Sequence, residues 1–506
     1  MKKIRTRFAP SPTGPLHIGG VRTALYCYLF AKKNNGDFIL RIEDTDQGRY
    51  VKGAEEYILE ALAWSGISPN EGQGVGGDFG PYRQSERKYL YKQYVDDLIL
   101  KGAAYYAFDT SKELTAWREE NTNVKYDSTT REALNNSLTL SKEAVQEKLD
   151  SGADYVIRYK MPKNETVTFS DEIRGSVSFQ TNDLDDKVLF KSDGMPTYHL
   201  ANIVDDHLME ITHVIRGEEW LPSTPLHVKL YESFAWEMPI FAHLPLILKP
   251  SGKGKLSKRD GDKLGFPVFP IDWFDEASQD TFMGFREQGF LADGFINMLA
   301  FLGWSPGTEQ EIFSLQELEE VFSLDKVNKS GASFNFDKTK WFNQQYIKNQ
   351  TDDELVILSK EIFEAAGYKA EDTYLKGVCN LIKERVIFLK DFPEMGYYFF
   401  ENIKDYDEKM LKKKWNPEHK EKIDALVENL AKLEDFSAEN IENLVKAFME
   451  EFELGFGQVL PVLRISVTGS MQGPSIFDVM ALVGKETTLK RLGKGIALAV
   501  ELKASK

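Results

Sequence analysis

The chain has 506 residues, a formal net charge of −16, and 42% hydrophobic and 28% charged residues. This length predicts roughly three to four domains, because one hydrophobic core rarely grows beyond about 250–300 residues. The composition is typical of a globular protein and argues against long disorder. The net charge excludes a uniformly basic surface, but it still allows one basic face that binds nucleic acid.

The cysteines and the N-terminus indicate the compartment. Cys27 and Cys379 lie far apart in sequence and form neither a disulfide framework nor a metal-spaced pair. The first residues, MKKIRTRFAPSP, lack the apolar run of a signal peptide, and no stretch approaches the ~18 apolar residues of a membrane span. We therefore expect a cytoplasmic protein without a membrane partner.

The first fifty residues predict a strand, a helix and a second strand. Residues 4–8 (IRTRF) form the first predicted strand, and the Pro/Gly-rich loop APSPTGPLHIGG follows it. Apolar residues at helical spacing run from Val21 to Leu29, and residues 34–36 (NNG) end the helix. Residues 37–44 (DFILRIED) alternate into a strand with a polar carboxyl end. The pattern predicts a βαβ unit.

The rest of the chain changes pattern twice. Residues 80–185 mix helical and hairpin-like segments, after which short apolar runs broken by charged loops return. This range predicts an insertion into the first domain. From Lys338 onward the sequence is rich in Lys and Glu with apolar spacing of 3.6 residues, as at Ile441, Val445 and Phe448. That pattern predicts an all-helical C-terminal third.

Two glycine-containing loops carry the chemical signal. Residues 15–20 (PLHIGG) lie where a strand gives way to a helix, and free backbone N–H groups at a helix start favour an anion. Residues 251–261 (SGKGKLSKRDG) gather Lys253, Lys255, Lys258 and Arg259 after an apolar run. Alone, the first loop fits an ordinary turn and the second a solvated basic surface; the first matches neither the dinucleotide fingerprint nor the P-loop. Their combination favours a functional role over either ordinary interpretation.

Together the two loops resemble the HIGH-like and KMSKS-like signatures of class I aminoacyl-tRNA synthetases, which grip ATP from opposite sides. The block RFAPSPTGPLHIGGVRTALYCYLFAKKNNGDFILRIEDTD is similar, almost residue for residue, to the N-terminus of glutamyl-tRNA synthetases. Residues 186–265, 324–347 and 450–500 also resemble that family. The resemblance implies an α/β fold with a Rossmann-like catalytic domain at 1–80 and 186–250, an inserted acceptor-binding α+β subdomain at 81–185, a stem-contact domain at 251–337, and a helical anticodon-binding region at 338–506.

The resemblance implies an ATP-dependent ligase that joins L-glutamate to tRNA(Glu) through a glutamyl-adenylate, with release of pyrophosphate, and then transfers it to the terminal adenosine. The long helical C-terminal half argues against a HIGH-superfamily nucleotidyltransferase that acts on a small molecule. Retention of the motif residues argues against a non-catalytic RNA-binding paralogue. The sequence leaves open a non-discriminating enzyme that also charges tRNA(Gln). It also leaves open whether activation requires tRNA and the oligomeric state, although a monomer is usual for the family.

Site residues follow from the same resemblance, position by position. The implied catalytic residues, which stabilise charge on the phosphates, are His17, Lys255 and Lys258. The implied ATP-binding residues are Ser11, His17, Gly19, Gly20, Glu219, Lys255, Ser257, Lys258 and Arg259. The implied glutamate-binding residues are Arg7, Ala9, Ser11, Glu43, Tyr198, Asn202 and Arg216. We expect Glu43 to hold the substrate ammonium, and Arg216 to select glutamate because a neutral amide would leave its desolvated charge without a partner.

We expect Mg²⁺ to accompany ATP through its phosphates and water, without a dedicated protein cage. Some members of the family carry a zinc site in the insertion, built from thiolates of an AYYCFCT-like segment and a later cysteine. Here Ala107, Asp109 and Thr130 stand at those positions. We therefore expect no structural zinc and no other metal site, so that hydrogen bonds and packing hold the insertion.

Overall fold

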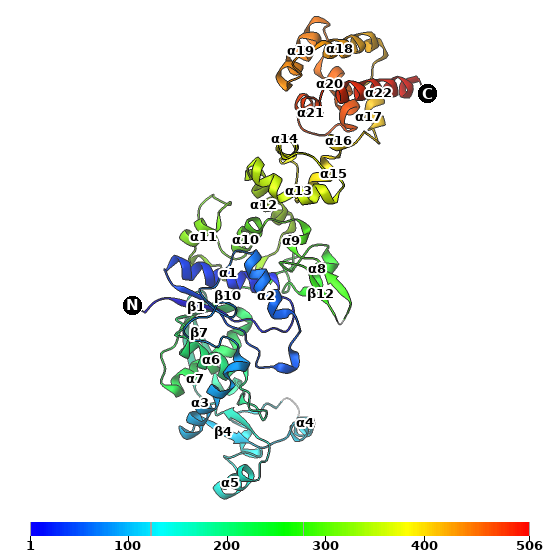
Figure 1. Cartoon of the computed structure of the whole chain (residues 1–506). Coiled ribbons are helices and arrows are strands. Elements are labelled where there is room, and N and C mark those ends of the chain that lie inside the picture. Colours follow the sequence, from blue (N-terminus) through cyan, green and yellow to red (C-terminus); the bar gives the residue numbers. More distant parts are fainter. Residues whose placement is uncertain (1, 122–123, 277, 505–506) are drawn as a thin grey trace. The chain divides into compact units, whose positions relative to one another are not determined.

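The computed structural model describes residues 2–121, 124–276 and 278–504. It divides into two compact units (Figure 1), unit 1 with Met1–Glu287 and Ala292–Thr339, and unit 2 with Gln288–Leu291 and Lys340–Lys506. Each unit has its own core and is treated by itself. In one helix, α8 (Lys258–Leu264), the side chains of Lys258, Arg259 and Asp262 lie outside the described part.

Unit 1 is built on a seven-stranded sheet in the order β3-β2-β1-β9-β10-β6-β7. Its strands are β1 (Arg5–Phe8), β2 (Asp37–Leu40), β3 (Glu71–Gly72), β6 (Thr166–Asp171), β7 (Gly175–Gln180), β9 (His213–Gly217) and β10 (Ile240–Leu244). Neighbouring strands pair in parallel except for the β6–β7 hairpin. The chain leaves β1 towards β2 on one side and returns as β9 on the other. In open α/β sheets, ligands bind outside the carboxyl ends of the strands at such a switch point.

The predicted βαβ opening is confirmed. Between β1 and β2 lies α1 (Ile18–Lys33), which buries Val21 and Leu29 and packs against β1, β2 and β9. The polar residues predicted at the end of the second strand are buried, because an inner parallel strand is covered on both faces. Arg41 and Glu43, just beyond β2, are 0% and 6% exposed. The polar side chains at this end of the strand therefore form internal ion pairs and do not face solvent.

Helices cover both faces of the sheet (Figure 1), with α1 above β1 and β10 in that view and α6 (Tyr198–Leu208) and α7 (Thr224–Phe234) below them. On one face α1 packs against α10 (Ala292–Ala300) and α11 (Leu315–Val321). On the other, α6 packs against α7 and against α3 (Lys88–Leu100). The remaining elements of this unit include α2 (Ala54–Trp64), α9 (Phe285–Gln288), the hairpin β12 (Trp273–Asp275) and β13 (Asp280–Phe282), and the pair β11 (Ile247–Leu248) and β14 (Ala332–Ser333).

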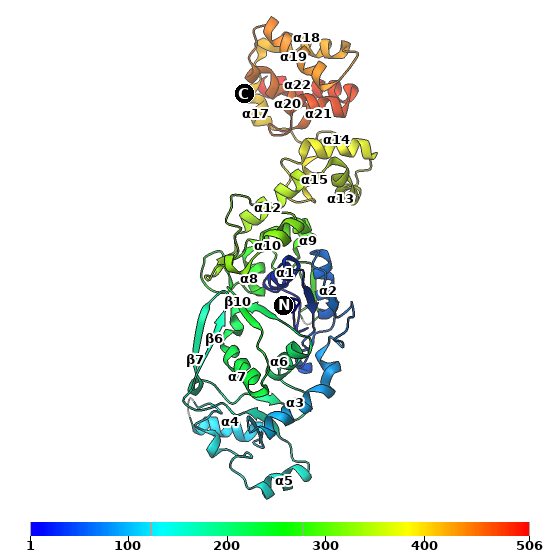
Figure 2. The same cartoon turned by 90° about the vertical axis from the view of Figure 1, so that its left-hand side faces the viewer.

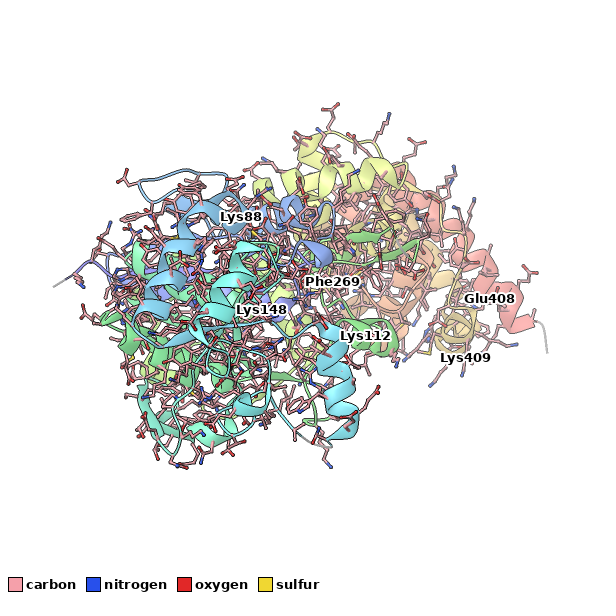
Figure 3. All side chains as sticks on the ribbon, turned by 90° about the horizontal axis from the view of Figure 1, so that it is seen from below. Lys88, Lys112, Lys148, Phe269, Glu408 and Lys409 are labelled. Atoms are coloured by element: carbon pink, nitrogen blue, oxygen red, sulfur yellow. The ribbon has the colours of Figure 1, made fainter. Side chains whose placement is uncertain are left out.

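The insertion has its own antiparallel sheet of β4 (Ala104–Ala107), β5 (Val156–Tyr159) and β8 (Val188–Phe190). Its helices α4 (Ser111–Glu120) and α5 (Lys142–Asp150) are seen from below in Figure 3, with Lys112 and Lys148 labelled. The sequence boundary of 81–185 differs from this arrangement. β6 and β7 lie inside that range, yet they extend the main sheet through β10, whereas β8 lies beyond it. Pairing of β6 with β10 covers what would otherwise be an open sheet edge.

Hydrogen bonds engage Asp109 and Thr130, two of the positions at which the resemblance would place zinc-binding thiolates. The Asp109 carboxylate accepts from the Asn135 N–H at 2.9 Å and the Tyr126 hydroxyl at 3.1 Å. Asn136 Nδ2 donates to Arg131 O at 2.7 Å, and Thr130 Oγ1 donates to a backbone carbonyl. Among the residues that the structure describes, no group of three or more His, Cys, Asp or Glu could hold a metal ion.

Unit 2 is all-helical in its described part (Figure 2), as the sequence predicted. The boundary between the units falls within α12 (Phe336–Asn349). The further helices are α13 (Asp352–Ala365), α14 (Asp372–Ile382), α15 (Asp391–Met395), α16 (Tyr397–Phe400), α17 (Glu408–Lys414), α18 (Lys420–Lys432), α19 (Ala438–Glu451), α20 (Phe456–Thr468), α21 (Ile476–Val483) and α22 (Lys485–Ala504). In α19 the residues Ile441, Val445 and Phe448 are buried, in line with their spacing. None of the described helices is long and apolar enough to span a membrane.

Candidate active site

A cavity of about 660 Å³ lies at the carboxyl ends of β1, β9 and β10, at the switch point of the sheet. Every predicted site residue whose side chain is described lines it: Arg7, Ala9, Ser11, His17, Gly19, Gly20, Glu43, Tyr198, Asn202, Arg216, Glu219, Lys255 and Ser257. Lys258 and Arg259 were predicted as well, but their side chains lie outside the described residues. The fold thus brings together segments that are more than two hundred residues apart.

His17 forms the N-cap of α1 at one end of the cavity. Its Nδ1 accepts a hydrogen bond from the Gly19 N–H at 3.1 Å, so the neutral ring carries its proton on Nε2. The Ile18 N–H donates to Val268 O at 3.0 Å. The expectation of free N–H groups at this helix start is therefore wrong for Ile18 and Gly19. The imidazole, backed by the helix dipole, is the donor that this turn can present to an anion.

Gly20 has a packing role at this turn. A Cβ atom there would lie 2.5 Å from Leu16 Cδ1, well inside van der Waals contact. The absence of a side chain lets the loop after β1 close onto α1. Glycine at this position therefore shapes the turn that holds His17.

The basic loop reaches the cavity through Lys255. Its Nζ lies 2.7 Å from Glu219 Oε1, in the segment after β9. Ser257 caps α8, because its hydroxyl donates to Asp260 Oδ2 at 2.6 Å and its N–H donates to the same oxygen at 2.8 Å. Lys249 donates to the other oxygen of Asp260 at 2.8 Å. These contacts order the loop that presents Lys255.

Buried ion pairs fix the residues at the opposite end. Arg7 Nε donates to Asp206 Oδ1 at 3.1 Å, and Arg41 pairs with the same carboxylate at 2.8 Å. Arg41 also pairs with Glu43 at 2.9 Å, and Asn202 Nδ2 donates to Glu43 Oε1 at 3.0 Å. Burial raises the pKa of Glu43 although Arg41 and Arg7 act in the opposite direction. Two guanidinium groups and two carboxylates balance each other, which gives a charged but rigid wall.

Arg216, at the end of β9, is surrounded differently. It is 5% exposed, and its guanidinium donates to neutral groups: Tyr198 Oη at 3.0 Å, Thr224 Oγ1 at 2.9 Å and His243 Nε2 at 3.1 Å. Within the described part of the chain it forms no ion pair. A buried cation without a carboxylate partner is costly, and an anionic ligand in the cavity would remove that cost.

Comparisons with known proteins agree with this geometry. Residues 3–341 match the family described as tRNA synthetases class I (E and Q), catalytic domain, and residues 351–496 match an anticodon binding domain. The chain is 56% identical over 498 residues to a glutamate–tRNA ligase of Christiangramia forsetii, covering 98% of this chain and 99% of that protein. It is also 56% identical over 501 residues to one of Flavobacterium psychrophilum, with coverage of 98% and 99%. The chain belongs to the glutamate–tRNA ligase family.

Solved structures of the glutamate–tRNA ligase family agree over the whole length. A glutamate tRNA ligase from Elizabethkingia meningosepticum, in complex with its amino acid, is 50% identical with a TM-score of 0.94, covering 98% of this chain and 99% of that one. The synthetase from Elizabethkingia anophelis is 50% identical with a TM-score of 0.92, covering 98% and 100%. This chain is therefore an aminoacyl-tRNA synthetase with a class I catalytic domain and a helical anticodon-binding domain.

Sequence reasoning missed the residues behind the ligase cavity. Arg41 and Asp206 hold Arg7 and Glu43, and His243 contacts Arg216. Two signals were visible in the sequence: the charged Arg41 within the second predicted strand, and His243 at the start of an apolar run. Such groups need internal partners when they are buried. Their partners could not be named from spacing alone.

A second cavity of about 550 Å³ shares Tyr198 with the first and faces the insertion. Its lining includes the basic residues Arg118, Lys125, Arg158 and Lys187. Arg158 is fixed over the Tyr126 ring, with its guanidinium carbon 3.8 Å from the ring centroid, whereas Lys187 pairs with Asp185 at 2.7 Å. The cavity joins a basic surface to the active-site wall.

Proposed function

We propose that the enzyme ligates L-glutamate to tRNA(Glu) in two steps. The α-carboxylate of glutamate attacks the α-phosphorus of ATP, which forms glutamyl-adenylate and releases pyrophosphate. A hydroxyl of the terminal adenosine then attacks the acyl carbon, and AMP leaves. The observation that carries the proposal is the buried Arg216, without an ionic partner in the described part of the chain, in the same cavity as His17 and Lys255.

Arg216 suits the side-chain carboxylate of glutamate, since a guanidinium can donate two charge-assisted hydrogen bonds to it. Glutamine would leave this buried charge unpaired, which costs about 3–5 kcal/mol. Glu43 suits the substrate ammonium, because Arg41 and Asn202 fix its carboxylate at the cavity wall. Tyr198 and Asn202 complete this end, together with Ala9, Ser11 and the Nη1 group of Arg7, whose Nε and Nη2 donate to Asp206.

The phosphates of ATP lie between the two loops in this proposal. His17 donates from Nε2, and Lys255, Lys258 and Arg259 neutralise the charge that develops on the departing pyrophosphate. Ser257, Gly19 and Gly20 shape this end of the cavity. Mg²⁺ fits as a companion of the nucleotide, bound mainly by phosphate and water.

The acceptor end of tRNA is expected to enter along the second cavity and to reach the first beside Tyr198. Arg118 and Lys125 supply positive charge there, as phosphate contacts require. The helical unit 2 would carry the anticodon contacts.

We propose a cytoplasmic monomer that is specific for tRNA(Glu). The relatives are named for glutamate and do not favour an enzyme that also charges tRNA(Gln).

Charging of purified tRNA(Glu) and tRNA(Gln) with labelled glutamate tests the proposal. Wild-type enzyme should charge tRNA(Glu) alone, and Arg216→Ala and Lys258→Ala should each lose most of the activity. Arg286→Ala is the matched control, since Arg286 pairs with Glu60 and Glu287 away from the cavity. Charging of both tRNAs would establish the broader enzyme, and folded protein that charges neither would refute the proposal.

A further inference from the structure

Behind Arg216 lies a buried pair that does not touch the cavity. His243, in β10 and 0% exposed, receives the Arg216 Nε hydrogen bond on Nε2 at 3.1 Å. Its other nitrogen, Nδ1, lies 2.6 Å from Asp171 Oδ2. Neither His243 nor Asp171 is among the described residues that line the cavity. The pair therefore acts on a ligand through Arg216, directly and by way of Thr224, whose Oγ1 lies 3.2 Å from His243 Nε2 and accepts from Arg216.

The donors and acceptors fix the protonation of the ring. Arg216 Nε can only donate, so His243 Nε2 must accept, and the single ring proton resides on Nδ1, which donates to Asp171. A doubly protonated ring would place two donors against each other. Burial, the largest influence, lowers the pKa of His243 and favours the neutral ring. Burial, the largest single influence, acts to raise the pKa of Asp171, but the hydrogen bonds from His243 and from the Arg174 N–H together outweigh it, so the pKa is lowered and the carboxyl stays ionised.

The hairpin that supplies Asp171 is itself anchored to this part of the sheet. Asp171 Oδ1 accepts from the N–H groups of Ile173 at 3.0 Å and Arg174 at 2.8 Å. Arg174 donates from Nε to His243 O at 3.2 Å and pairs with Glu218, two residues beyond Arg216, at 2.7 Å. The acceptor presented to Arg216 thus belongs to a rigid corner of β6, β9 and β10.

An interposed neutral histidine has a specific consequence for charge. A carboxylate in direct contact with Arg216 would orient the guanidinium, but it would also compete with an anionic ligand. Asp171 orients the guanidinium plane of Arg216 indirectly, through the neutral His243 ring. The positive charge of Arg216 therefore stays available to the ligand. The Asp171–His243 pair, together with Tyr198 and Thr224, restrains the Arg216 guanidinium. A guanidinium restrained in this way is already oriented for bidentate hydrogen bonding to a carboxylate.

We propose that Asp171 and His243 are positioning residues that hold Arg216 for the side-chain carboxylate and thereby set the preference for glutamate over glutamine. This rests on the proposed function of Arg216.

Two substitutions at one position test the idea. In His243→Asn the amide can occupy the place of Nδ1 and donate to Asp171, but the acceptor for Arg216 is lost. In His243→Gln the side chain reaches the place of Nε2 and can accept from Arg216. We expect His243→Asn to raise the KM for glutamate and to lower the glutamate-to-glutamine selectivity, each by about tenfold or more, because a hydrogen bond to a charged group is lost. His243→Gln should restore most of the selectivity, and the KM for ATP should change by less than about twofold in both.

Asp171→Asn is a second variant that keeps the shape of the pair. Its amide can donate to His243 Nδ1, which moves the ring proton to Nε2 and sets it against Arg216 Nε. We expect the same loss of glutamate selectivity as in His243→Asn. Thermal unfolding of each variant identifies any that are misfolded, and glutamate binding measured by calorimetry gives the affinity without the reaction.

Arg216→Gln, alone and combined with His243→Asn, separates this inference from the proposed function. If Arg216→Gln leaves glutamate selectivity unchanged, the proposed role of Arg216 fails and the inference fails with it. If Arg216→Gln abolishes selectivity but His243→Asn and His243→Gln behave alike, only the inference is overturned. The inference also requires that His243→Asn has almost no further effect on glutamate binding in the Arg216→Gln background; a persisting tenfold effect would contradict it.

Discussion

Lys255 Nζ lies 2.7 Å from Glu219 Oε1, a contact that ties the loop after β11 to the segment after β9. The side chains are 55% and 42% exposed, so the pair contributes at most about 1 kcal/mol to stability. Both residues line the active-site cavity. The pair therefore keeps the loop lysine inside the cavity through a contact that phosphate oxygens of ATP would replace in the proposed reaction.

Substitution of the two partners should have unequal effects on ATP binding. Lys255→Ala removes a cation that would face phosphate, and we expect the KM for ATP to rise about tenfold or more. Glu219→Gln removes the ionic partner of the lysine but keeps a polar side chain in the cavity, and we expect a change below about fivefold. Aminoacylation rates at varied ATP measure both. Lys253→Ala, an exposed lysine of the same loop, is the control, and an effect equal to that of Lys255→Ala would contradict this role.

Removal of the shared carboxylate in the buried wall should destabilise the catalytic unit. Asp206 pairs with both Arg7 and Arg41, and Asp206→Asn leaves two buried guanidinium groups without their common partner. We expect a loss of about 3–5 kcal/mol in the free energy of unfolding, measured by urea denaturation. Asp46→Asn breaks an exposed pair with Arg49 and should change it by less than about 1 kcal/mol. Equal losses would refute the importance of burial.

The sequence could predict which residues line the cavity but not what holds them. Arg7 and Glu43 belong to a contiguous block whose pattern is recognisable. Asp206, which pairs with Arg7 and Arg41, comes from a helix 199 residues beyond Arg7. The same limit applies to β6, whose alternating burial fits a strand in either sheet. Which edge it joins is decided by the pairing of Asp171 with Phe241, and therefore by three-dimensional packing. The helical region was easier to predict from the sequence, because the apolar spacing within each amphipathic helix indicates its buried face.

His213 should make the enzyme sensitive to acid. Burial lowers the pKa of His213 from 6.5 to about 4 in the folded protein. The folded state thus favours the neutral ring, so this stability is present above about pH 6.5 and is lost as the pH falls towards 4. We expect the unfolding temperature to fall less between pH 7 and pH 5 in His213→Gln than in wild type. Parallel pH profiles would show that His213 does not contribute.

Asn136 should be more important than any metal for the stability of the insertion. It is 0% exposed, and its Nδ2 donates to Arg131 O, Leu134 O and Tyr126 Oη at 2.7, 3.1 and 3.2 Å. Asn136→Ala removes these three buried hydrogen bonds at once, and we expect a loss of at least about 2 kcal/mol in the free energy of unfolding. Asn121→Ala, at an exposed helix end of the same subdomain, should cost less than about 1 kcal/mol.

A chelator completes this test, because the network around Asn136 stands where a zinc site would need thiolates. Treatment of the wild-type enzyme with a strong chelator should leave its unfolding midpoint unchanged, and activity should return fully when Mg²⁺ alone is supplied. The reason is that Asp109 and Thr130 already have hydrogen-bond partners and, among the described residues, no set of metal ligands is present beside them. A midpoint that falls on chelation and recovers only with zinc would show that a metal, and not hydrogen bonding, holds this subdomain.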